Sequence, residues 1–240
     1  MTTLVAWISY PRPGYSSAIY LASDSRITWG SQNNRWDAGR KLFTTTAKAH
    51  AFGYCGDVVF PSLVLAQVTS AIDHDLLFDN NIAASHKHAA VVSVIKTSFG
   101  RRHNTPDRSF DIVHAYRHGA GRECSFHLWR LQYDHSARIW SVDSLSVPVQ
   151  TETITELGTG ARATQRHHRR WGTSDVAGSS RAVFSAFGDA LQSQEDPLSG
   201  GAPQLAALYR RGPAQSLGVG MKGGAICMGC LSRSMPSHQN

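Results

Sequence analysis

A threonine stands at the second position of the chain, directly before the apolar segment Leu4–Ile8. A threonine hydroxyl is a weak nucleophile and needs a base to take its proton. Once Met1 is removed, the α-amine of Thr2 can be that base, because a free α-amine has a pKa of about 7.7–8.0. Thr2 would then supply nucleophile and base together. Since threonine is common after an initiator methionine, this feature alone is weak support for catalysis.

Asp24 and Lys41 are the charged groups that such a nucleophile could use. Asp24 lies in the segment ASDSRIT, and Lys41 begins the segment KLF. Residues 3–10 and 17–23 are predicted to form a hairpin, which would bring Asp24 near Thr2. A nearby ammonium favours the unprotonated hydroxyl and amine, and the carboxylate would hold that ammonium in place. The alternative is a surface ion pair without function, which contributes only about 0–1 kcal/mol.

The segment Gly53–Asp57, with the sequence GYCGD, separates a predicted strand from a predicted helix. A backbone N–H at such a junction can bind a developing oxyanion, although a simple tight turn explains the glycines equally well. Cys55 could be a separate nucleophile, but it has no evident base, so an inert buried thiol is favoured. Candidates for a specificity pocket are Tyr54, Cys55 and the residues near Trp29.

Four segments in this order resemble the active-site motifs of proteasome β subunits and their bacterial relatives. They are TTLVA at 2–6, ASDSRIT at 22–28, Lys41-x-Phe43, and DPLSGG at 196–201 before an apolar run. The resemblance implies an α+β fold, a four-layer αββα sandwich, in an N-terminal-nucleophile hydrolase. It also implies hydrolysis of amide bonds through an acyl-enzyme, without a metal or another cofactor.

The resemblance assigns a role to each matching residue. Thr2 would be nucleophile and base, Lys41 would tune its hydroxyl and amine, and Asp24 would orient Lys41. Gly56 would donate the oxyanion N–H, and the backbone of Thr28 would pair with an extended peptide substrate. Arg26, Ser199 and Gly200 match structural positions near the site.

The sequence departs from the family pattern in several places, and two of these departures concern candidate site residues. The turn GTG at 158–160 replaces the usual G-S-G, so Thr159 would supply the hydroxyl of the family serine. The family's second aspartate and its serine precede the third helix, and the candidates here, at imperfect spacing, are Asp175 and either Ser179 or Ser180.

The remaining pattern predicts the elements that must position these groups. Helices are expected to begin with Pro61 as a first helical residue and with Asn81 and Ser180 as caps, and residues 24–34 are expected to form a loop. The order is strands, two helices, strands, one or two helices, strands, in one domain spanning 1–240 with a frayed tail from about 232. The other strands are expected at 40–45, 49–54, 110–116, 125–133, 138–144, 153–157, 205–209 and 217–221.

Composition limits the remaining functions. The 240 residues are 41% apolar and 17% charged, which is typical of a globular protein. Neither a secretion signal nor a membrane span is recognisable, and few cysteines argue against a disulfide framework, so a cytoplasmic protein is expected. The pair Cys227 and Cys230 lacks a second ligand pair for zinc. The net charge is +7, and the basic cluster at 166–170 is interpreted as a solvated face rather than a nucleic-acid site.

Three functions are therefore open. The favoured one is a threonine peptidase that forms a homo-oligomeric ring, acts on peptides or unfolded chains, and works with a possible unfoldase. The second is an amidase or acylase that uses the same residues on a small molecule. The third is a non-catalytic subunit-like scaffold, which would have no need for Thr2, Asp24 and Lys41 together.

Overall fold

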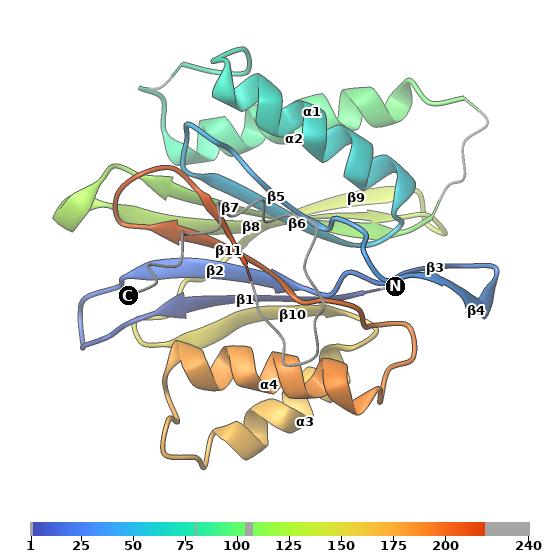
Figure 1. Cartoon of the computed structure of the whole chain (residues 1–240). Helices are drawn as coiled ribbons and strands as arrows, with labels where there is room; N and C mark the ends of the chain where they lie inside the picture. Colours follow the sequence, from blue (N-terminus) through green and yellow to red (C-terminus); the bar gives the residue numbers. More distant parts are fainter. Residues whose placement is uncertain (1, 80, 104–107, 219–240) are drawn as a thin grey trace, which may run out of the picture.

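Two β-sheets pack face to face between two pairs of helices in the computed structural model, which describes residues 2–79, 81–103 and 108–218 (Figure 1). This is the four-layer αββα sandwich expected from the sequence. The first sheet has the strand order β10-β1-β2-β11-β12. Its strands are β1 (Thr3–Ser9), β2 (Ala18–Ser23), β10 (Glu152–Gly158), β11 (Gln204–Tyr209) and β12 (Gln215–Leu217).

The second sheet has the order β5-β6-β7-β8-β9, and its outer face is covered by α1 and α2. Helices α3 and α4 cover the outer face of the first sheet. The second sheet contains β5 (Leu42–Thr44), β6 (His50–Gly56), β7 (Phe110–His118), β8 (Ser125–Asp134) and β9 (Ile139–Leu145). The helices are α1 (Val59–Asp73), α2 (Ala84–Gly100), α3 (Ala161–Trp171) and α4 (Ser180–Ser193), with a short 3₁₀ turn at Gly121–Glu123.

Strand β1 is the centre of this arrangement because both of its faces are buried. Leu4, Ala6 and Ile8 pack between the two sheets, whereas Val5 and Trp7 pack toward α4. This explains why the strand reads as a continuous apolar run instead of an alternating one. Burial of each large side chain contributes about 1.5–3 kcal/mol, so the start of the strand is held firmly in the core.

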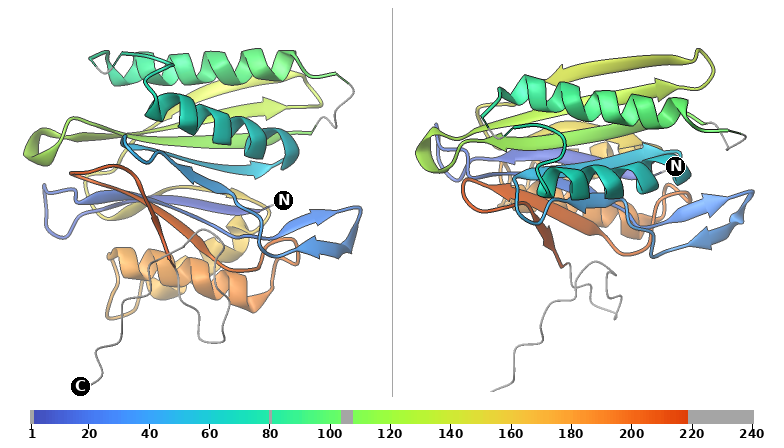
Figure 2. Two further views of the ribbon diagram at one scale, coloured as in Figure 1. Left: turned by 45° about the horizontal axis from the view of Figure 1, so that its top comes forward. Right: turned by 90° about the horizontal axis from the view of Figure 1, so that it is seen from above.

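The predicted hairpin formed by β1 and β2 is confirmed, with Leu4 opposite Ser23 and Ser9 opposite Ala18. The residues that follow it are not the expected loop. They form a second, two-stranded hairpin of β3 (Ile27–Trp29) and β4 (Ser31–Trp36). This hairpin projects from the layers at the end of the molecule where β1 begins (Figure 2).

Several predicted helix boundaries were wrong. Helix α1 begins two residues before Pro61, and α2 begins after Ala83, which makes no side-chain cap, so Asn81 is not its cap. Ser179, not Ser180, caps α4 by accepting a hydrogen bond from the Ala182 amide at 3.3 Å. The expected strand at 217–221, the tail from 232 and the Cys227–Cys230 pair lie wholly or partly outside the described residues.

Candidate active site

Thr2 lies at the edge of the first sheet where β1 begins and where β2 and β10 end. The next residue, Thr3, pairs with Gly158 at the end of β10, and the Asp24 amide donates to the Thr3 carbonyl at 3.3 Å. Gly158 has a φ of +88°, and a side chain there would collide with the Thr2 carbonyl oxygen. Glycine is therefore required at Gly158 for β10 to approach Thr2 this closely.

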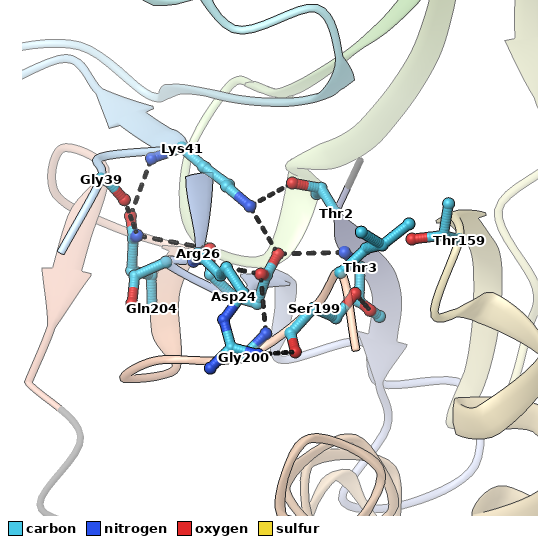
Figure 3. Close-up of polar contacts among 12 residues, drawn as sticks. Thr2, Thr3, Asp24, Arg26, Gly39, Lys41, Thr159, Ser199, Gly200 and Gln204 are labelled. Atoms are coloured by element: carbon cyan, nitrogen blue, oxygen red, sulfur yellow. Dashed lines mark hydrogen bonds and ion pairs between the residues drawn. The ribbon is translucent and has the colours of Figure 1, made fainter. Parts of the chain in front are cut away.

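Lys41 joins Thr2 to Asp24 (Figure 3). Its ammonium donates a hydrogen bond to Thr2 Oγ1 and forms an ion pair with Asp24 Oδ1 at 2.8 Å. Lys41 and Asp24 are completely buried. Burial lowers the pKa of Lys41, and the Asp24 carboxylate opposes that shift by charge and hydrogen bonding. The structure thus brings together the three residues that the sequence singled out, in contact and shielded from water.

The Asp24 carboxylate is fixed by the backbone as well as by Lys41. Oδ1 accepts from the Thr3 amide at 3.0 Å, and Oδ2 accepts from the amides of Arg26 at 3.1 Å and Gly200 at 3.0 Å. Hydrogen bonds of this kind stabilise the ionised carboxylate. Asp24 therefore has a fixed position from which it orients the Lys41 ammonium.

Arg26 and Gly200 hold the loop before β11 against this carboxylate. The guanidinium of Arg26 makes a two-pronged contact with Asp37, at 2.7 and 2.9 Å, and donates to the carbonyls of Pro197 and Ser199. A side chain at Gly200 would clash with that guanidinium. Both residues therefore lie in contact with the segment that surrounds the Asp24 carboxylate.

A chain of hydroxyls runs from Thr3 to Asp196. Thr3 Oγ1 donates to Ser199 Oγ at 2.8 Å, and Ser199 Oγ donates to Asp196 Oδ2 at 2.7 Å. Thr159 Oγ1 donates to the same carboxylate oxygen at 2.6 Å. Thr159 and Ser199 thus meet beside the start of β1, linked by the Asp196 carboxylate.

Asp175 is not part of this cluster, so this assignment was wrong. It is exposed in the connection between α3 and α4, and Figure 1 shows this connection at the opposite end of the helical layer from the marked N-terminus. Helix α3 begins beside Thr3 and carries the chain away from the site, and α4 returns it. Asp196 occupies the place expected for Asp175. The signal was present in the DPLSGG motif, three residues before Ser199.

Gln204 at the start of β11 is a supporting residue that the sequence did not reveal. Its side-chain oxygen accepts from the amides of Lys41 at 3.0 Å and Leu42 at 3.3 Å. Its side-chain amide donates to the carbonyl of Gly39 at 2.6 Å. Gln204 therefore clamps the backbone that carries Lys41 onto the first sheet.

A cleft of about 490 Å³ lies between β3 and the start of α1. Thr28 and Trp29 line one wall, and Gly56, Asp57 and Val59 line another. Strand β3 pairs with β4, with Thr28 opposite Arg35, and with no other strand of the described residues. The Thr28 hydroxyl is buried and bonds to no group that the structure describes.

Tyr54 and Cys55 are not in this cleft. Tyr54 is fully buried among the residues beneath α1, and its hydroxyl donates to the Arg40 carbonyl at 3.2 Å, so its assignment to substrate binding was wrong. Cys55 is buried beside Asp111, and burial raises the pKa of its thiol. A thiol that resists ionisation in this way is a poor nucleophile.

Within 2–79, 81–103 and 108–218, no cluster of three or more histidine, cysteine or carboxylate side chains suits a metal ion. None of the helices in these ranges has the length and apolar character needed to span a membrane.

The sequence matches no family model, and comparison with curated proteins also gave no match. The structure is similar to that of eukaryotic HslV from Trypanosoma brucei, with a TM-score of 0.52 and 12% sequence identity. The match covers 86% of this chain and 99% of that one. This similarity confirms that the chain has the proteasome-like sandwich fold expected from its motifs.

Proposed function

We propose that this protein is a threonine-type N-terminal-nucleophile hydrolase that cleaves amide bonds. The supporting observation is the buried contact in which the Lys41 ammonium, paired with Asp24, donates a hydrogen bond to Thr2 Oγ1. Burying two charges costs free energy even when they form a pair, and such a pair often adds no net stability. A purely structural role is therefore a poor explanation for this arrangement. Removal of Met1 would make Thr2 the first residue of the mature chain.

The proposed reaction uses Thr2 twice. Its hydroxyl attacks the amide carbonyl carbon while its α-amine takes the hydroxyl proton, and the Lys41 charge stabilises the negative charge on Oγ1. The proton then passes to the leaving amine as the C–N bond breaks, which leaves an ester on Oγ1. Water gives a proton to the α-amine and attacks that ester. As the ester C–O bond breaks, the α-ammonium returns the proton to Oγ1, which releases the acid and restores Thr2.

The substrate is proposed to be an extended peptide. The edge of β3 that does not pair with β4 is available for backbone pairing through Thr28, as in strand addition. Gly56 lies across the same cleft, compatible with the oxyanion role that the resemblance assigns to its N–H. A homo-oligomeric ring, an unfoldase partner and a cytoplasmic location also remain proposals. Light scattering after size exclusion tests the ring, and a strict monomer would count against it.

Labelling of Thr2 is the direct test of the mechanism. Intact-mass spectrometry should show loss of Met1, and a β-lactone probe should add once, on Thr2. Thr2→Ala should abolish labelling and turnover, and Lys41→Ala should slow both strongly. Thr173→Ala, in the exposed connection after α3, removes a threonine hydroxyl elsewhere and should leave both unchanged. Full turnover in Thr2→Ala would exclude the proposed mechanism.

A small-molecule amidase or acylase is the second candidate, because a cleft of about 490 Å³ falls in the usual size range of small-ligand sites. The same Thr2 chemistry would then act on a short acyl amide. Parallel assays with fluorogenic peptides and acyl amides separate the two, since only one class should be cleaved efficiently.

A further inference from the structure

A second cavity, of about 380 Å³, opens at the opposite end of β6 from the cleft. Gly56 at the end of β6 lines the cleft, whereas His50 at its start lines this cavity. The strand has seven residues, so the two lie about 20 Å apart at about 3.3 Å per residue. This cavity is therefore separate from the proposed catalytic cluster, and nothing about it depends on the proposed function.

The lining of the cavity is positively charged. It includes Lys48, Lys87 and Arg117, and no carboxylate side chain of the described residues is among the groups that line it. Lys48 forms an ion pair with Asp75 at 2.7 Å, but Asp75 lies outside the lining. We call this cavity the basic pocket.

Lys87 is held in a fixed position within the basic pocket. It is 5% exposed, and its ammonium donates to the Tyr116 hydroxyl at 3.1 Å. The same ammonium lies 5.5 Å from the centre of the Phe78 ring and 5.2 Å from that of Tyr116. A buried cation and two aromatic rings thus face one space, a combination that suits an anion attached to an apolar body.

Arg117 provides a second fixed donor. Its Nε donates to the Gly119 carbonyl at 2.9 Å, and its Nη1 donates to the carbonyls of Tyr209 and Gly212. These bonds fix the guanidinium plane, while Nη2 bonds to no group that the structure describes. A guanidinium with its plane fixed and one nitrogen unused is well suited to bind an oxyanion.

The pKa of His50 reflects the positive charge of this region. Burial, followed by the charges of Lys87 and Lys48, lowers its pKa to about 3 despite the opposing charge of Asp73. The lining thus places cationic groups close to a buried imidazole. A bound anion would offset the repulsion among these cationic groups.

We propose that the basic pocket binds a small oxyanion, such as a phosphate or carboxylate group, carried on an aromatic body. The oxyanion contacts Lys87 and Arg117, and the aromatic body packs against Phe78 and Tyr116. Phosphate is the better fit, because its several oxygens can accept from both cations at once.

Titration calorimetry with phenyl phosphate tests this proposal, with benzoate, inorganic phosphate and phenol as comparison ligands. Phenyl phosphate should bind most tightly, at least about tenfold more tightly than phenol. Tighter binding of benzoate than of phenyl phosphate would identify the ligand head as a carboxylate. Failure of both aromatic anions to bind would overturn the proposal.

Variants and NMR spectroscopy test whether the ligand binds in the basic pocket. Lys87→Met removes the buried charge and should weaken the binding of phenyl phosphate by about tenfold or more. Arg169→Gln removes a charge on the exposed face of α3 and should leave this binding unchanged. If Lys87→Met fails to fold, Lys48→Glu places an acid at the mouth and should weaken binding in its place. In the unaltered protein, NMR signals of His50 and Tyr116 should shift and those of Thr28 should not. Equal binding by all folded variants would overturn the assignment.

Discussion

At the residue scale, the Asp24 carboxylate compensates the buried ammonium charge of Lys41. Both it and Lys41 are completely shielded, and a lone buried ammonium is strongly unfavourable. Asp24→Asn should therefore lower the free energy of unfolding by about 3–5 kcal/mol. It should also allow Lys41 to lose its proton more readily, because burial alone already lowers the pKa of Lys41. Urea unfolding at neutral pH measures the first effect.

The Lys48–Asp75 pair offers a matched control for Asp24→Asn. Asp75 is half-exposed, and its distance to Lys48 is 2.7 Å, similar to that of the buried pair. Asp75→Asn makes the same chemical change and should cost only about 0–1 kcal/mol. Equal losses in the two variants would show that the Asp24 carboxylate is not compensating a buried charge.

The sequence identified Thr2, Asp24 and Lys41 because each lies in a short motif or at the end of a predicted strand. Gln204 could not be found in this way, since its partners lie 162 to 180 positions away along the chain. Asp175 fits the family pattern only by its place before a helix, and the course of α3 carries it away from the site. Residues that act through long-range backbone contacts thus leave little local signal.

At the element scale, the end of β10 sets the position of Thr2. Gly158→Ala would place a methyl group against the Thr2 carbonyl and also strain a φ of +88°. We expect it to cost more than the about 1–2 kcal/mol due to the backbone alone, and to slow labelling of Thr2. Gly14→Ala is the control, because Gly14 has a φ of +73° with nothing within 4 Å of the added methyl. Similar losses in both variants, with normal labelling, would contradict this role of Gly158.

The sequence pattern predicts some of the helices and strands and misses others. Strands β1, β2 and β6 have strong apolar patterns and turn residues beside them, so the sequence found them. Helix α3 has the sequence ARATQRHHRRW and buries only Ala163 and Thr164, so its apolar stripe is too narrow to detect. The β3–β4 hairpin was missed because it projects from the layers and lacks an alternating apolar face.

At the scale of the whole molecule, three buried histidines tie the second sheet to α2. His114 on β7 lies at 2.9 Å from His50 on β6 and at 3.0 Å from His88 on α2, measured between ring nitrogens. Burial lowers the pKa of all three, to about 3 for His50 and about 4 for His88. They are therefore neutral in the folded protein at neutral pH.

Acid should therefore unfold the molecule through these histidines. In the unfolded chain each has a pKa of about 6.5, so below that pH the unfolded chain binds protons that the folded chain excludes. Stability should be complete above about pH 6.5 and fall toward pH 4, by up to about 1.4 kcal/mol per pH unit for each histidine. Urea unfolding across this range measures the slope.

His88→Phe should reduce the slope of stability against pH by the contribution of one histidine, because phenylalanine keeps the stacking on Trp129 without a titrating group. His74→Gln, exposed at the end of α1, should leave the slope unchanged. The comparison depends on slopes alone, so a loss of stability in His88→Phe at neutral pH does not affect it. A wild-type stability that does not change between about pH 4 and 7 would mean that the three imidazoles take up protons without opening the layer between the sheet and α2.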